Sequence, residues 1–147
     1  LIKSRFDKFN IKVIENIDDI EILSYQNELF QVILNLFSNS IDVLSSSQIE
    51  NKIIYIKIYH DENNLYIEFL DNGGGIKDEF INRVFEPYFT TKHKSQGTGI
   101  GLYMSLQIVT KHLNGEISVK NDTFIENNTA YFGAKFTILL PIHLQNN

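Results

Sequence analysis

The stretch Asn35-Leu36-Phe37-Ser38-Asn39 is followed, in this order, by Asp71-Asn72-Gly73-Gly74-Gly75-Ile76 and by Gly97-Thr98-Gly99-Ile100-Gly101-Leu102. Each of these three segments is weak evidence when it is taken alone. Together they offer amide oxygens for a cation, a carboxylate for the edge of a base, and glycine backbone for phosphates. The chain is therefore predicted to bind magnesium and a nucleotide, with ATP as that nucleotide.

The first segment lies on the clearest helix that the sequence predicts, from Gln26 to about Leu44. Ser24 or Asn27 is expected to cap this helix. Asn35 and Asn39 are four residues apart and share one face, where their amide oxygens suit a magnesium ion. A simply solvated polar face is the alternative. The opposite face is apolar and carries Leu29, Val32, Ile33, Leu36, Phe37, Ile41 and Leu44.

Asp71 ends a predicted strand and leads into three glycines. A carboxylate at this place can accept a hydrogen bond from the exocyclic amine of adenine, whereas guanine presents a carbonyl at the matching position. The glycines allow a sharp turn and a close approach to a flat ligand. An ordinary Asp-Asn-Gly turn is the alternative.

The third segment directly precedes a second predicted helix, which Asn114-Gly115 ends. Backbone N–H groups at a helix start can bind phosphate, although the glycine spacing matches neither a P-loop nor the dinucleotide fingerprint. A flexible hinge is the alternative. Just upstream, Lys92 could contact a phosphate as a point charge or could be a solvated loop lysine.

Aromatic residues surround Pro87 in a stretch, Phe85 to Thr98, that shows no clean period. We expect Phe85, Tyr88 and Phe89 to dock this loop on the core and to anchor a mobile lid over the nucleotide.

The remaining pattern predicts a mixed sheet with about three helices on one face, an α+β sandwich. Polar turns are expected at Asn16–Asp19 and Asp122–Thr129, and a short helical stretch is expected near Lys77–Val84. The expected strands are Ile11–Ile14, Ile20–Leu23, Lys52–Tyr59, Leu65–Leu70, Ile117–Lys120 and Tyr131–Leu140.

Composition narrows the classes of function. The 147 residues fit one domain, 1–147, and the net charge of −5 argues against nucleic acid as a partner. The absence of cysteine excludes disulfides and favours a reducing, cytoplasmic compartment. No apolar stretch is long enough to span a membrane. The first residue is Leu1, so we expect a piece of a longer protein, whose membrane attachment is left open. The four histidines, His60, His93, His112 and His143, form no metal-binding pattern.

With these residues assembled, the chain resembles the catalytic, ATP-binding domain of sensor histidine kinases. This domain belongs to the Bergerat-fold superfamily, which also contains gyrase, heat-shock chaperone ATPases and mismatch-repair ATPases. The resemblance runs from about Ile11 to Pro141. Residues 31–42 resemble the N box, Asp71–Ile76 the G1 box, residues 84–92 the F box, and Gly97–Leu102 the G2 box. Four boxes in order make the resemblance specific.

The resemblance implies a two-layer α/β sandwich, in which a mixed, mostly antiparallel sheet packs on about three helices below a mobile ATP lid. It implies that Asn39 is the main magnesium ligand, that Asn35 assists it, and that Asp71 holds the adenine amine. Further nucleotide contacts are implied for Val43, Gly73, Gly75, Ile76, Thr90, Thr91, Lys92, Gly97, Thr98, Gly99, Ile100, Gly101 and Leu102.

Asn35 separates two activities within the superfamily. Hydrolytic relatives have a glutamate at this place, which activates water, whereas an amide cannot act as a base. Phosphoryl transfer needs mainly alignment and charge neutralisation, so the resemblance favours a kinase over an ATPase. The implied acceptor is a histidine on the protein's own dimerisation domain, which is absent from this chain. No catalytic residue is therefore assigned here, and the implied downstream partner is a response regulator.

The chain departs from the family pattern at three places. Ser40 stands where alanine is usual, and Gly133-Ala134 stands where glycine is often followed by threonine or serine. Asp42 replaces the basic residue of many sensor kinases, which suggests a nitrogen-regulator-like subgroup. The alternatives are an ATPase of the same fold, an anti-sigma-type serine kinase, and a module that binds nucleotide and partners without chemistry.

Overall fold

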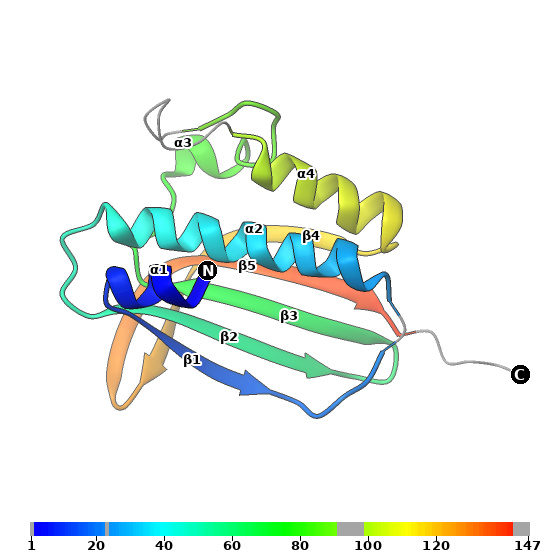
Figure 1. Ribbon diagram of the computed structural model, residues 1–147, viewed down its shortest axis with the longest axis horizontal. Helices are drawn as coiled ribbons and strands as arrows, with labels where there is room; N and C mark the ends of the chain where they lie inside the picture. Colours follow the sequence, from blue (N-terminus) through cyan, green and yellow to red (C-terminus); the bar gives the residue numbers. More distant parts are fainter. Residues whose placement is uncertain (1, 23, 91–98, 143–147) are drawn as a thin grey trace, which may run out of the picture.

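The computed structural model describes residues 2–22, 24–90 and 99–142. At its centre is a sheet of five strands in the order β1-β2-β3-β5-β4. β1 runs parallel to β2, and the other three pairings are antiparallel. The expected mixed, mostly antiparallel sheet is therefore confirmed (Figure 1). The strands are β1 (Ile11–Ile17), β2 (Lys52–His60), β3 (Asn64–Asp71), β4 (Glu116–Glu126) and β5 (Thr129–Pro141).

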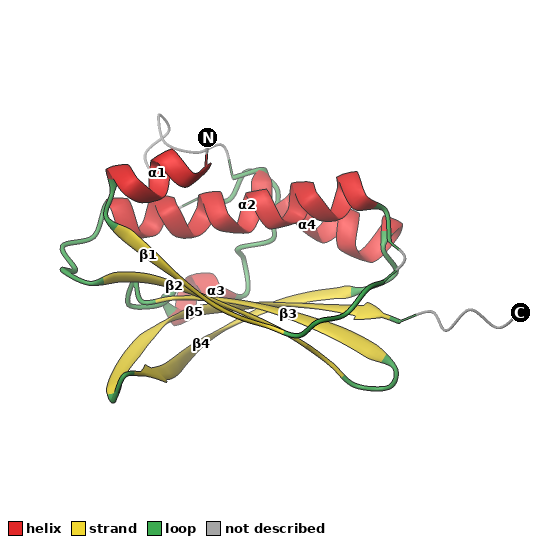
Figure 2. Cartoon of the chain, turned by 60° about the horizontal axis from the view of Figure 1, so that its bottom comes forward, coloured by secondary structure: helices red, strands yellow, loops and turns green. Residues whose placement is uncertain are grey.

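Three helices, α1, α2 and α4, form one layer over one face of this sheet (Figures 1 and 2). The predicted two-layer α+β sandwich is thus confirmed. A short α3 precedes the loop that leads to α4, and α4 continues into the π-helical turn η1. The bounds are α1 (Ile2–Lys8), α2 (Gln26–Ser45), α3 (Asp78–Ile81), α4 (Gly101–Gln107) and η1 (Ile108–His112).

The core lies between the sheet and α2. Strand residues that point to the same side alternate along each strand, so Phe69 and Phe136, which are paired across β3 and β5, both face the helices. On α2, Leu36 and Ile41 are fully buried against this sheet face. Each such side chain stabilises the fold by roughly 1.5–3 kcal/mol through burial. This packing places one side of α2 in the core and leaves Asn35 and Asn39 on another side.

The long helix begins at Gln26 as predicted and extends one residue past Leu44. The predicted cap is wrong, because Tyr25 occupies the N-cap position and no side chain bonds the free amides there. Packing of the apolar face, rather than a cap, therefore holds this end of the helix.

The predicted strand Ile20–Leu23 is wrong over residues 20–22, and Leu23 lies outside the described residues. β1 instead continues into the first half of the expected turn, as far as Ile17, and the Asp18 amide still donates to the Ile58 carbonyl at 2.9 Å. Beyond this point the chain leaves the sheet to reach α2, with Ile20 and Ile22 partly buried against the core. Parallel pairing with β2, which local sequence cannot reveal, lengthens β1.

The last hairpin is longer than predicted. The turn expected over Asp122–Thr129 contains only Asn127 and Asn128, which have φ angles of 50° and 62°. Asparagine tolerates such angles, which match the twist of a two-residue hairpin. The flanking polar residues pair across the ladder, and Phe124 stacks on Tyr131 at 5.3 Å.

The second predicted helix is confirmed as α4 and η1, and Asn114, with φ 53°, ends it as expected. The helix expected near Lys77–Val84 is the four-residue α3. Sequence reasoning missed α1, although Phe6 and Phe9 of this segment pack on the core.

Candidate nucleotide-binding site

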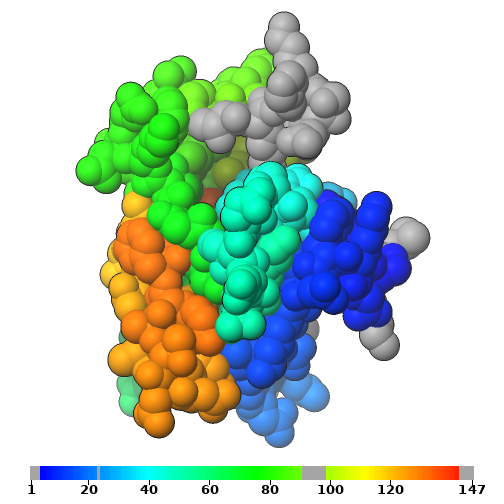
Figure 3. Space-filling view, turned by 90° about the vertical axis from the view of Figure 1, so that its left-hand side faces the viewer, coloured from blue at the N-terminus to red at the C-terminus, as the bar shows by residue number. Residues whose placement is uncertain are grey.

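A cavity of about 260 Å³ opens between α2 and the segment that precedes α4. Figure 3 shows the hollow between residues 78–90, in green, and the end of α2, in cyan. Its walls are formed by residues of α2, of α4, of β5 and of the segment that runs from β3 to α4. They are Asn35, Ser38, Asn39, Asp42, Val43, Ile76, Phe80, Val84, Phe89, Thr90, Gly99, Gly101, Leu102 and Phe136.

The cavity brings together residues from all four boxes. Eight predicted site residues line it: Asn35, Asn39, Val43, Ile76, Thr90, Gly99, Gly101 and Leu102. Four others, Asp71, Gly73, Gly75 and Ile100, are not among the lining residues. The remaining four, Thr91, Lys92, Gly97 and Thr98, lie outside the described residues, as does most of the expected lid.

Asp71 lies behind the cavity wall, at the end of β3, and is only 2% exposed. Its Oδ1 accepts a hydrogen bond from the Gly73 amide at 2.9 Å. A Cβ on Gly73 would stand 2.6 Å from the Val43 side chain and 3.1 Å from Asp71 Oδ1. Gly73 therefore lies between the cavity-lining Val43 and the carboxylate, and the missing side chain allows their close approach.

Burial raises the pKa of the Asp71 carboxyl to about 6. Hydrogen bonds from the Gly73 and Ala134 amides and from the Ser40 side chain act in the opposite direction and favour the ionised form. At neutral pH the group is thus mainly a buried carboxylate held by neutral donors. Such a group accepts hydrogen bonds strongly, as recognition of an amine requires.

The close approach of β5 to Asp71 requires a glycine at position 133. A Cβ there would stand 1.9 Å from the Asp71 carbonyl oxygen. Only glycine lets the backbone of β5 come so close to β3. A glycine inside a strand pattern is the sequence signal for such an approach.

Asn121 of β4 holds the turn that follows Asp71. Its Oδ1 accepts from the Ile76 amide at 2.8 Å, and its Nδ2 donates to the Ile76 carbonyl at 2.7 Å. The turn also contains Gly74 and Gly75, whose φ angles of 91° and 85° suit glycine. Sequence reasoning missed Asn121, because nothing local relates it to residue 76.

The two asparagines of α2 have different surroundings. The Asn35 Nδ2 donates to the Gly101 carbonyl at 3.2 Å and to Ser105 Oγ at 3.1 Å, while its Oδ1 accepts from Gln31 at 2.9 Å. The side chain of Asn35 therefore links the start of α4 to α2 by hydrogen bonds. Asn39 lies one turn further along α2, half-buried in the cavity wall.

The predicted docking of the aromatic loop on the core is confirmed for Phe85, whereas Phe89 packs on Phe80 of α3. Phe85 packs edge-on against Phe136 at 6.1 Å, and Phe89 packs against Phe80 at 5.7 Å. The prediction for Tyr88 is wrong, since this side chain is 75% exposed. Its backbone has φ 65° and its amide donates to the Gly99 carbonyl at 3.0 Å, so the turn directs the ring to solvent.

Sequence reasoning also missed several wall residues. Ser38 could have been found, because it follows Asn35 at helical spacing, whereas Asp42 was noted in the sequence but was not assigned to the site. Val84 belongs to the F box but was not assigned to the site, and Phe80 and Phe136 gave no such signal, because only tertiary packing brings them to the cavity.

Among the described residues, no three His, Cys, Asp or Glu side chains form a possible metal-binding group. The amide oxygens available from Asn35 and Asn39 are hard ligands, which fit magnesium held mainly by phosphates and water. No helix in the described part of the chain is both long and apolar enough to cross a membrane.

Residues 24–144 match the family of histidine kinase-, DNA gyrase B- and HSP90-like ATPases. The chain belongs to this family. Its similarity is to the catalytic, ATP-binding domains of sensor histidine kinases, as the sequence predicted.

Two curated relatives illustrate the similarity. A probable C4-dicarboxylate sensor kinase of Halalkalibacterium halodurans is 35% identical over 115 residues, which are 78% of this chain and 20% of that protein. Sporulation kinase A of Bacillus subtilis is 37% identical over 114 residues, 78% of this chain and 17% of that protein. The chain thus spans about a fifth of the length of these relatives.

Solved structures agree on the fold. The catalytic domain of histidine kinase ThkA superposes with a TM-score of 0.76 at 25% identity, covering 96% of this chain and 85% of that domain. A structure of histidine kinase ThkA in complex with the response regulator protein TrrA gives a TM-score of 0.73 at 22% identity, covering 97% of this chain and 37% of that one.

Proposed function

We propose that this chain binds Mg-ATP in the cavity and donates the γ-phosphate to a histidine on a separate dimerisation domain, in two-component signal transduction. The observation that carries this proposal is the amide at Asn35 beside Asn39 on the cavity wall. Membership of the family supports ATP as the ligand. The relatives' names support a histidine kinase.

In this proposal the base end of the nucleotide lies towards Val43, with Asp71 behind it accepting from the adenine amine. Asn39 supplies the main amide oxygen to magnesium, and Asn35 assists. Magnesium, when bound, neutralises phosphate charge and holds the phosphates in line. Lys92, Thr91 and the backbone of Gly97 to Leu102 are proposed as further phosphate contacts.

Transfer requires a nucleophile that this chain does not supply. A ring nitrogen of the acceptor histidine forms the new bond to the γ-phosphorus, while the bond to the bridging oxygen breaks and ADP leaves. Asn35 has no basic group to activate water in its place. The hydrogen bonds of Asn35 to Gly101 and Ser105 also commit its amide to orienting α4.

The proposal extends to partners and domain organisation. The 147 residues are a single catalytic domain, which acts on the dimerisation domain of its own protein. A cytoplasmic response regulator would then receive the phosphate, and the ThkA–TrrA complex is a structural precedent in a neighbour of this fold.

The test is incubation of the full-length gene product with γ-labelled Mg-ATP, with Asn39→Ala as the inactive control. We expect phosphate bound to protein that is labile in acid and stable in base, as phosphohistidine is. The unmodified 147-residue chain should bind an ATP analogue with magnesium.

Other outcomes identify the alternatives. Acid-stable label on serine would indicate the anti-sigma type of kinase. Steady release of free phosphate without labelled protein would indicate an ATPase. Binding without either reaction would indicate a non-catalytic module, and no binding would overturn the site.

A further inference from the structure

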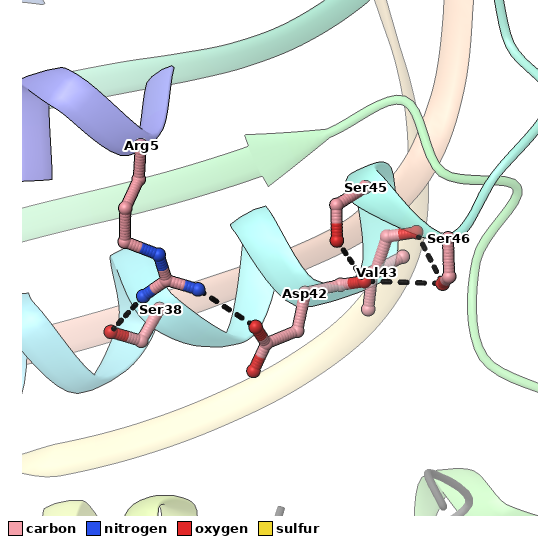
Figure 4. Close-up of polar contacts among 6 residues, drawn as sticks. All are labelled: Arg5, Ser38, Asp42, Val43, Ser45 and Ser46. Atoms are coloured by element: carbon pink, nitrogen blue, oxygen red, sulfur yellow. Dashed lines mark hydrogen bonds and ion pairs between the residues drawn. The ribbon is translucent and has the colours of Figure 1, made fainter. Parts of the chain in front are cut away.

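Arg5 connects the N-terminal helix to the wall of the cavity. Its Nη2 donates to Asp42 Oδ1 at 2.8 Å and its Nη1 donates to Ser38 Oγ at 3.3 Å. Both acceptors line the cavity from α2. Figure 4 shows the guanidinium reaching from α1 across to these two side chains, and Figure 3 shows α1, in blue, beside the end of α2.

The negative charge of Asp42 lies at an electrostatically unfavourable position, in the wall of the cavity and at the end of α2. Among the described residues that line the cavity, it is the one with a formal charge. It lies in the last turn of α2, where the helix dipole is negative and no basic residue of α2 compensates it. Ser45 and Ser46 hold the Asp42 carbonyl, each at 3.1 Å, which fixes the backbone at this point.

The ion pair is only partly screened by solvent. The Arg5 and Asp42 side chains are 37% and 30% exposed. Two negative groups, a carboxylate and a polyphosphate, would repel each other within one Debye length, about 8–10 Å. A guanidinium on that carboxylate reduces the repulsion.

We infer that Arg5 is a positioning residue of the nucleotide site: it holds and neutralises Asp42, so that the seating of α1 and the binding of the phosphates are coupled. This inference rests on the proposed binding of Mg-ATP. The coupling is reciprocal, so nucleotide in the cavity stabilises the docked position of α1 as much as docked α1 favours the nucleotide.

The test is a double-mutant cycle in the 147-residue chain, with Mg-ATP and adenosine as the two ligands. The variants are Arg5→Ala, Asp42→Asn and the double variant. We expect Arg5→Ala to raise the Kd for Mg-ATP about threefold to tenfold at low salt, because more of the Asp42 charge then faces the phosphates. In the Asp42→Asn background the same substitution should have no effect on that Kd.

Two further measurements separate this role from simple stabilisation of α1. Adenosine carries no phosphate, so its Kd should not change in Arg5→Ala, whereas a loosened fold would weaken both ligands. The effect on Mg-ATP should also shrink as salt increases. Lys8→Ala is the matched control, since it removes a positive charge from the same helix at an exposed position.

An equal effect of Arg5→Ala in both backgrounds, an equal effect on both ligands, or no effect on Mg-ATP would each overturn the inference while leaving Mg-ATP binding in place. If the unmodified chain binds no Mg-ATP, the proposed function fails first and the inference fails with it.

Discussion

Asp71 and Asp42 are two aspartates at opposite depths of one site. Asp71 is 2% exposed and is held by the backbone amides of Gly73 and Ala134 and by the side chain of Ser40 on α2. Asp42 is partly exposed on α2 and is held by a charged guanidinium from another helix. We call the region around Asp71, behind the cavity wall, the floor of the site. It offers a fixed, desolvated hydrogen-bond acceptor, which the proposed function assigns to the base. We call the Asp42 end of the cavity the mouth, where the ion pair with Arg5 is partly exposed and can therefore be screened by salt.

The floor should be the more sensitive region to added volume. Gly133→Ala places a Cβ 1.9 Å from the Asp71 carbonyl oxygen, which belongs to a paired strand and cannot move aside. We expect a loss of about 3 kcal/mol in the free energy of unfolding, measured by urea denaturation. The control is Gly101→Ala, where a Cβ meets nothing within 4 Å. Equal stability of the two variants would show that β5 yields at this point.

The floor should also dominate recognition of the base. Asp71→Asn replaces the acceptor for the adenine amine, and we expect adenosine and Mg-ATP to lose affinity roughly tenfold to a hundredfold. Isothermal titration of both ligands measures this, with a thermal melt to verify folding. Asp19→Asn, at an exposed aspartate, should change neither Kd. An unchanged affinity in Asp71→Asn would mean that this carboxylate does not meet the base.

A substitution at the mouth should weaken the binding of magnesium and phosphates rather than the binding of the base. Asn39→Ala removes the proposed amide ligand, so we expect the Kd for Mg-ATP to rise roughly tenfold and the Kd for adenosine to stay within about twofold. Asn27→Ala, on the same helix but exposed in its first turn, is the control. A parallel loss for both ligands would place Asn39 at the base end instead.

The smallest expected effect is that of pH on adenosine binding, through protonation of Asp71. Because the pKa of Asp71 is raised to about 6, half of this group is protonated near that pH and is then a weaker acceptor for the amine. Adenosine affinity should fall about twofold from pH 7.5 to pH 6 and continue to fall below it. Asp71→Asn should lack this dependence.

Linkage predicts the matching change in stability. The folded state binds this proton more tightly than the unfolded chain, whose pKa is near 3.8. The contribution of Asp71 to the free energy of unfolding is thus greatest below about pH 4 and is lost as pH rises through 6.

The local sequence pattern was sufficient to predict an element whose own residues specify its structure. The apolar face of α2, the β2–β3 hairpin and the stop at Asn114 were all confirmed. The local pattern failed to predict the lengths of strands that depend on pairing with a strand elsewhere in the chain. β1 is lengthened by its parallel partner, and the β4–β5 ladder extends to Asn127 through polar residues that looked like a turn.

The candidate site shows the same division. Asn35, Asn39 and Asp42 share a helix face, which fixed spacing alone predicts. Phe136 and Asn121 come from strands far away in the chain, so no spacing relates them to the boxes. Tyr88 belongs to a box by position, yet its backbone conformation turns it to solvent.

The sequence by itself determined the family, the order of the boxes and the amide at Asn35, because residue identity and short-range spacing carry that information. Tertiary structure alone decided that Asp71 is buried behind Val43 and that Gly133 must let β5 approach it. It also decided that Arg5, thirty-seven residues from Asp42, holds that carboxylate at the mouth. These features depend on which surfaces meet when the sheet and the helices pack, and burial and charge pairing act across space rather than along the chain.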